Sequence, residues 1–161
     1  MLELAQWLSD TPISLAIRQR DWLIPLLQTI HILGIAMVVS SVFLIDLRIL
    51  QITRSQSTAA TAHRYVPWIW TGLGILATSG LTLIIAEPQR ALPNPAFQIK
   101  MLLLSIAIAT TCAFQTSLRR NASFWEGSGP ARMMNVLAMG VFVLWCSIAL
   151  AGRLIAYLQP A

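Results

Sequence analysis

A single histidine stands inside a long apolar stretch near the start of the chain. His31 is the only ionisable side chain between Trp22 and Ile45, and this stretch is long enough to cross a lipid bilayer. An imidazole in hydrocarbon is costly, so it requires a partner such as a metal ion, a haem, a counter-charge or a path of water. His31 is therefore a candidate axial haem ligand, metal ligand or proton relay.

Three other polar residues are expected near the level of His31. Lys100 opens the third apolar stretch from the same side of the membrane, Arg153 closes the fourth on that side, and Gln28 lies one helical turn before His31. Two cations beside an imidazole require an anionic group, which Glu87 or the propionates of a haem would supply. We expect His31 to bind iron, with Lys100 or Arg153 holding the propionates and Gln28 beside them.

The second histidine cannot share a cofactor with the first. His63 precedes the second apolar stretch at the opposite surface, so the two imidazoles are about 25 Å or more apart along the membrane normal. A haem with two histidine ligands from one chain is excluded. The second axial ligand would be Lys100 or a group of another molecule, or the second axial position would be open.

These polar residues also have ordinary structural interpretations. His31 could simply hydrogen-bond to a neighbouring helix, and Lys100 and Arg153 could extend from the ends of the spans to the lipid headgroups. At the far end of the first span, Asp46 and Arg48 are expected to form an ion pair at the membrane interface.

The composition requires a membrane environment for the helices that carry these residues. The chain has 161 residues, of which 57% are hydrophobic and only 11% charged, whereas a soluble domain carries about a quarter charged residues. We predict an all-α integral membrane protein, a single domain over residues 1–161 in which four transmembrane helices form an up-down bundle. The predicted spans are about 22–47, 65–87, 97–118 and 132–157.

The segment that precedes the first span, residues 1–21, is predicted to lie along the membrane surface. It carries acidic residues and no early basic cluster or cleavage site, so it does not resemble a signal peptide. Two short amphipathic helices are expected, the second with Thr11 as N-cap and Pro12 in its first turn. They would place apolar side chains in the interface and charged ones in water.

The basic residues indicate lipid rather than nucleic acid as the partner. The net charge is +5, but the basic residues gather at the ends of the spans, so nucleic-acid binding is discarded. The excess of arginine in two connections predicts a multi-pass protein of the bacterial inner membrane. Loops 48–64 and 119–132 would be cytoplasmic and both termini outside.

Small residues in the second span, Gly72, Gly74, Ser79 and Gly80, have two interpretations. They allow close helix packing, which would also support a homo-oligomer or a place in a larger membrane complex. They would equally make room for a flat cofactor.

Short motifs resemble those of known bacterial membrane families. Gln-Thr-Ile-His31, Leu76-Ala-Thr-Ser-Gly80 and Phe97-Gln-Ile-Lys100 resemble helices of the HemJ-type protoporphyrinogen oxidases and of the copper-resistance D membrane domain. From Trp22 to Tyr157 the chain is most similar to a bacterial four-helix family catalogued as a domain of unknown function. The HemJ-type resemblance implies a b-type haem on His31 with Lys100 nearby.

Three functions follow as hypotheses. The first is haem b binding for membrane electron transfer, with a quinone or another redox protein as partner. The second is the handling of protons or metal ions, as the copper-resistance resemblance implies. The third is a non-catalytic accessory or scaffold subunit of a membrane complex.

Overall fold

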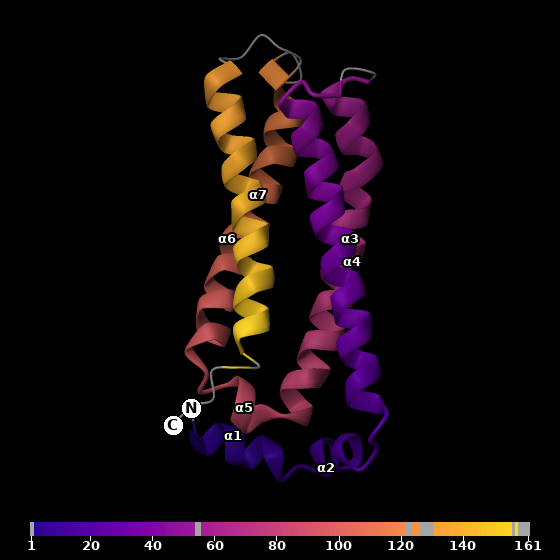
Figure 1. Ribbon diagram of the computed structural model, residues 1–161, viewed down its shortest axis with the longest axis vertical. Helices are drawn as coiled ribbons and strands as arrows, with labels where there is room; N and C mark the ends of the chain where they lie inside the picture. Colours follow the sequence, from indigo (N-terminus) through magenta and orange to yellow (C-terminus); the bar gives the residue numbers. More distant parts are fainter. Residues whose placement is uncertain (1, 54–55, 122–123, 126–130, 156, 158–161) are drawn as a thin grey trace.

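Four long helices stand side by side and short helices lie across one end of them (Figure 1). The computed structural model describes residues 2–53, 56–121, 124–125, 131–155 and 157. The long helices are α3 (Leu23–Ile49), α4 (Thr58–Ala86), α6 (Pro95–Arg120) and α7 (Ala131–Leu154). The short ones are α1 (Leu2–Ser9), α2 (Pro12–Arg18) and α5 (Pro88–Ala91).

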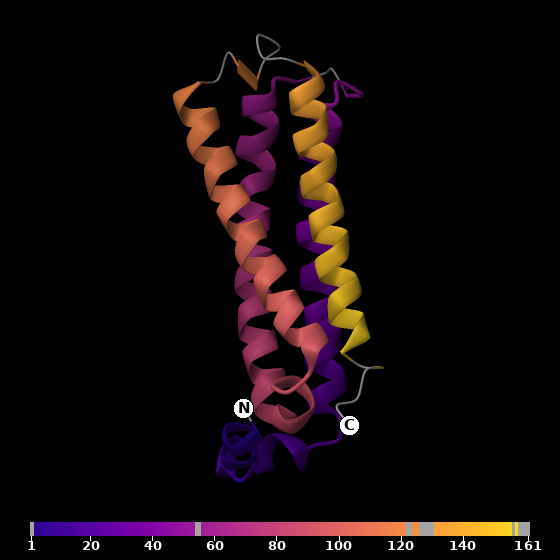
Figure 2. The ribbon, with the colours of Figure 1, turned by 90° about the vertical axis from the view of Figure 1, so that its left-hand side faces the viewer.

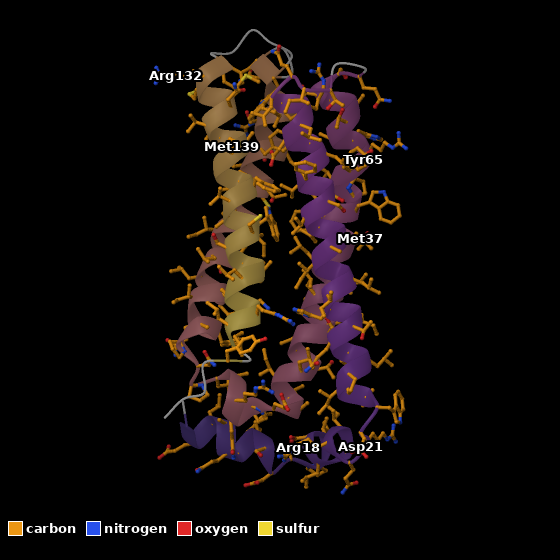
Figure 3. The ribbon with its side chains drawn as sticks, in the orientation of Figure 1. Arg18, Asp21, Met37, Tyr65, Arg132 and Met139 are labelled. Carbon is orange, nitrogen blue, oxygen red and sulfur yellow. The ribbon has the colours of Figure 1, made fainter. Side chains whose placement is uncertain are left out.

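The predicted all-α bundle is confirmed. Each long helix contains a stretch long and apolar enough to cross a membrane, four in all within the described residues. Short connections between consecutive long helices make them antiparallel, so the bundle runs up and down (Figures 1 and 2). Labelled side chains mark the two ends, with Arg18 and Asp21 at one end and Arg132 at the other (Figure 3).

The second long helix begins earlier than predicted. We expected a start near residue 65, but α4 begins at Thr58 because the Ser57 side chain accepts a hydrogen bond from the Ala60 amide. Pro67 lies inside this helix. Proline is tolerated there because helices in membranes can satisfy the freed carbonyl through neighbouring groups. Two turns that read as a loop in the sequence therefore extend α4 at the Arg132 end of the bundle.

The N-terminal segment forms the two short helices that the sequence predicts. Thr11 caps α2 by accepting a hydrogen bond from the Ser14 amide at 3.4 Å, and Pro12 occupies the first turn. Both helices run across the end of the bundle, roughly perpendicular to the long helices (Figures 1 and 2). Trp7 is 68% exposed and Ile13 65%, so large apolar side chains are available to enter a lipid interface.

The tightest packing joins α3 to α4. A Cβ atom at Gly72 would lie 2.5 Å from Val38 Cγ2 and 3.4 Å from the Gly34 carbonyl oxygen. Val38 is fully buried, so it has little room to move aside. Glycine at position 72 therefore allows the two backbones to approach more closely than any side chain would permit.

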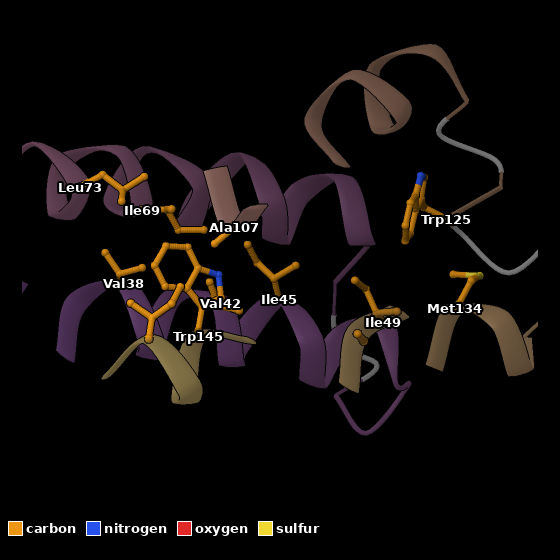
Figure 4. Packing of buried hydrophobic residues seen from close by; sticks show 12 residues of the cluster. Val38, Val42, Ile45, Ile49, Ile69, Leu73, Ala107, Trp125, Met134 and Trp145 are labelled. Carbon is orange, nitrogen blue, oxygen red and sulfur yellow. The ribbon is translucent and has the colours of Figure 1, made fainter. Parts of the chain in front are cut away.

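The apolar core lies between this pair and the helices α6 and α7. Trp145 from α7 is 2% exposed and packs in one cluster with Val38, Leu73 and Ala107, so all four long helices contribute (Figure 4). Another part of the same cluster lies towards the α3–α4 connection, where Trp125 and Met134 are found near Ile49 (Figure 4).

The close contact at Gly72 predicts a specific loss of stability. We expect Gly72→Ala to lower the free energy of unfolding by about 1–3 kcal/mol, because the new methyl group overpacks against Val38. The matched control is Gly74→Ala, because a Cβ there meets nothing within 4 Å. This control gains up to about 1 kcal/mol of helix propensity and loses no packing. Thermal unfolding of the two variants in detergent measures the difference, and equal midpoints would contradict the packing argument.

Candidate functional site

His31 and Lys100 meet inside the bundle. Lys100 Nζ on α6 lies 3.4 Å from His31 Nε2 on α3. Both side chains are partly buried, and they lie in the half of the bundle nearer α1 and α2. The contact joins two helices that are far apart in the sequence, and it brings together two of the residues predicted for the site.

A serine on α4 holds the other nitrogen of the imidazole. Ser79 Oγ lies 2.8 Å from His31 Nδ1 and 2.6 Å from the Ile75 carbonyl oxygen. A carbonyl can only accept, so the Ser79 hydroxyl donates its proton to Ile75 and presents a lone pair to the imidazole. Nδ1 of His31 must therefore carry a hydrogen and donate it to Ser79.

The opposite nitrogen is then an acceptor. A lysine ammonium has three donors and no acceptor, so Lys100 donates to His31 Nε2. The serine and the lysine independently assign the same form of the ring, a neutral imidazole with the proton on Nδ1 and a lone pair on Nε2. This form leaves Nε2 able to bind a metal or a proton when Lys100 moves away.

Two glycines make room for this pair. A Cβ at Gly80 on α4 would lie 3.3 Å from His31 Cε1, and a Cβ at Gly152 on α7 would lie 3.4 Å from Lys100 Nζ. All four long helices therefore take part, with His31 from α3, Ser79 and Gly80 from α4, Lys100 from α6 and Gly152 from α7. We call these five residues the His31 site.

The other predicted site residues lie at its margin. Gln28 and Arg153 are both exposed, and neither side chain makes a hydrogen bond to the part of the chain that the structure describes. Glu87, expected to neutralise the cations, forms an ion pair with Arg90 at 3.2 Å instead. No carboxylate contacts Lys100 within the described residues.

His63 is far from this site, as the sequence predicts. It lies sixteen residues before Ser79 in α4, which corresponds to about 24 Å along the helix. Its side chain is exposed near the other end of the bundle. Nor do three or more His, Cys, Asp or Glu side chains gather into a metal-binding group among the described residues.

Sequence reasoning found part of the site and missed part. The sequence places Ser79 and Gly80 in a small-residue face and in a short family-like motif, but it does not predict their contact with His31, and it gives no role to Gly152. The sequence signal for Ser79 is its spacing from Gly72. Ser79 follows Gly72 by two helical turns on α4, and His31 precedes Val38 by two helical turns on α3. Gly72 faces Val38 in the structure, so Ser79 must face His31 in an antiparallel pair.

Comparison with known proteins identifies the family. A model described as a family of unknown function, DUF6644, matches residues 23–158. The chain belongs to DUF6644. This agrees with the resemblance of residues 22–157 to a family catalogued as a domain of unknown function. No curated protein and no solved structure is significantly similar to the chain.

The matched region begins where the first long helix begins. α3 starts at Leu23, the first matched residue, so α1 and α2 precede the DUF6644 region. The match contains all four long helices and every residue of the His31 site. The site therefore belongs to the DUF6644 bundle and not to the preceding surface helices.

The geometry at His31 predicts its protonation pattern. In haem-free protein labelled with ¹⁵N-histidine, we expect NMR to show a proton on Nδ1 and a bare Nε2. Ser79→Ala should reduce this preference and cost about 1 kcal/mol of stability, because Nδ1 loses its acceptor. His63 provides an internal reference that the substitution leaves unchanged. A His31 ring protonated on Nε2 in the unsubstituted protein would contradict the assigned hydrogen bonds.

Proposed function

We propose that this DUF6644 protein binds haem b in the membrane and transfers electrons, with His31 as an axial ligand through Nε2. The observation that carries this proposal is the orientation of the imidazole. Its Nδ1 is held by Ser79 while its Nε2 lone pair is directed towards Lys100 on another helix. Histidines that ligate metals commonly donate their second ring nitrogen to a neighbouring acceptor in this way.

The residues present are suited to a haem. Nε2 of His31 has the lone pair that iron requires, and the group beside it is the end of a flexible lysine side chain. Lys100 would be displaced when haem binds, or its amine would become the opposite ligand. Gly80 and Gly152 place no side chain beside either partner. When bound, the haem would supply a centre for one-electron transfer.

The charge around the site also favours an anionic cofactor. Lys100 is partly buried and contacts no carboxylate among the described residues, while Glu87 is engaged by Arg90. Arg153 lies next to Gly152 in the sequence, on the same end of the bundle. Either cation could pair with a haem propionate. The resemblance of the His31 and Lys100 motifs to the HemJ-type families supports the same cofactor.

An absorption spectrum tests this proposal. Protein produced with ample haem and purified in detergent should show a Soret band. His31→Ala should lose the band, because the axial ligand is removed, and His63→Ala is the matched control that should keep it. Lys100→Met should shift the spectrum or the reduction potential if the lysine is a ligand or a propionate partner.

Two outcomes would overturn the proposal. Colourless, folded wild-type protein would show that haem is not bound. A Soret band that persists unchanged in His31→Ala would show that haem binds through another group.

A proton relay is the second candidate function. It is favoured by the continuous hydrogen-bonded link from Ser79 through His31 to Lys100, which crosses three helices. Such a link between two groups that can each hold or release a proton resembles the relays found in membrane pumps and transporters. Colourless protein that moves protons in vesicles, and loses this ability in Lys100→Met, would favour this function. Colourless protein without such movement would favour an accessory subunit.

We further propose that the protein lies in the bacterial inner membrane with both termini outside. The α3–α4 and α6–α7 connections, with the flanking helix ends that complete the predicted ranges 48–64 and 119–132, would face the cytoplasm. Its redox partner would be a quinone molecule or a second redox protein. The protein would form a homo-oligomer or be a subunit of a larger membrane complex. The excess of arginine at the loop ends supports this orientation.

Two exposed glutamines at opposite ends of the bundle allow a matched test of orientation. Gln56 precedes α4 and Gln89 lies in α5. In a variant with Cys112 and Cys146 replaced by serine, Gln89→Cys should react with a membrane-impermeant maleimide on spheroplasts. Gln56→Cys should react only after the membrane is opened. The reverse pattern would show the opposite orientation.

A further inference from the structure

A second polar feature lies at the other end of the bundle from the His31 site. A cavity of about 270 Å³ lies between the four long helices, lined by apolar side chains such as Ile45, Phe114 and Val141. One carboxyl group, that of Asp46 on α3, also lines it. Asp46 follows His31 by fifteen residues, or about 22 Å along the helix, so the two sites are separate.

Asp46 does not occupy the interface position expected from the sequence. Its side chain is only 5% exposed, and its Oδ2 accepts no hydrogen bond. The expected ion pair with Arg48 is hindered by the helix itself, because residues two positions apart do not face each other. Asp46 therefore turns inwards, towards the cavity.

The other polar groups around the cavity are already satisfied. The hydroxyls of Thr110 and Thr111 both donate to the Ala107 carbonyl, at 2.9 and 2.8 Å. Ser117 Oγ accepts a hydrogen bond from Trp125 Nε1 at 3.0 Å. No lysine, arginine or histidine is found among the described residues that line the cavity. A ligand that enters the cavity would therefore need a group that donates a hydrogen bond to the Asp46 carboxyl.

A preformed aromatic wall completes the cavity. Trp125 is held by two helices, because Thr58 on α4 donates to its carbonyl oxygen at 3.0 Å and Ser117 on α6 accepts from its indole nitrogen. Its ring packs edge-to-face against Phe114, with the ring centroids 4.9 Å apart. Aromatic faces favour both apolar groups and organic cations.

We propose that this cavity binds a small lipophilic amine in its ammonium form. A carboxylate buried among apolar groups without a partner is costly, and a cation that donates a hydrogen bond removes this cost. The ammonium would donate to the carboxyl group of Asp46, while the apolar body would lie against Phe114 and Trp125. The volume of about 270 Å³ suits a compact ligand, because it is slightly below the usual range of about 300–1,000 Å³ for drug-sized sites.

Three probes of the same shape and different charge test this proposal. They are 2-(1-naphthyl)ethylamine, the corresponding alcohol 2-(1-naphthyl)ethanol, and 1-naphthylacetic acid. Calorimetric titration of the full chain in detergent should show saturable binding of the amine. The alcohol should bind about tenfold or more weakly, because its hydroxyl can donate to Asp46 but carries no positive charge to compensate the buried carboxylate. The acid should not bind, because its charge repels Asp46.

Variants assign the binding to this cavity. Asp46→Asn keeps the shape of the side chain and removes its charge, so it should weaken amine binding by about tenfold or more. Val141→Phe keeps Asp46 and fills the space, so it should also weaken binding. The matched control is Ser41→Ala, a buried polar residue of α3 outside the cavity whose hydroxyl donates to the Met37 carbonyl at 2.7 Å. Elution as a single species and a thermal midpoint confirm that each variant is folded.

Three results would overturn the proposal. The amine could bind folded Asp46→Asn as tightly as the unsubstituted protein, the alcohol could bind as tightly as the amine, or the folded wild-type protein could bind no amine. The second result would point to a neutral apolar ligand. None of these results depends on haem, so the outcome is independent of the proposed function at His31.

Discussion

The close approach of α3 and α4 at Gly72 determines the arrangement of the whole site. Glycine is the one residue that avoids a contact of 2.5 Å with Val38, so the two helices can meet only in a narrow range of registers. Seven residues, or two turns, separate Val38 from His31 on one helix and Gly72 from Ser79 on the other. The register that accommodates Val38 therefore places the serine hydroxyl against the imidazole.

This hydrogen bond orients the imidazole for whatever chemistry it performs. With Nδ1 held by Ser79, the ring can neither flip nor exchange its proton without breaking a contact of 2.8 Å. The lone pair of Nε2 then points towards Lys100, which reaches across from α6. A haem ligand and a proton relay both require such an oriented nitrogen, which explains why the same geometry is compatible with both functions.

The bundle places its costly polar groups at two separate levels. The His31 site lies near α1 and α2, and Asp46 lies at the opposite end beside an apolar cavity. Between them the core consists of side chains such as Val38, Leu73 and Trp145. Because this apolar core separates them, Lys100 and Asp46 do not neutralise each other.

The sequence alone determined the spans and the most informative residue, because both follow from local properties. Runs of apolar residues predict membrane helices whatever their partners are, and a lone imidazole in such a run is costly in any bundle. Counting residues along the helices was also enough to separate His63 from His31 and to place Lys100 at the level of His31. Even so, a local cap at Ser57 extended α4 beyond the predicted start.

Only the tertiary structure decided which polar groups meet. The rotation and register of each helix depend on packing between helices, which no single stretch of sequence contains. This packing selected Ser79 and Lys100 as the partners of His31, left Gln28 and Arg153 exposed, and turned Asp46 inwards. The sequence thus determined at what depth each group lies, whereas the contacts between the helices determined what each group faces.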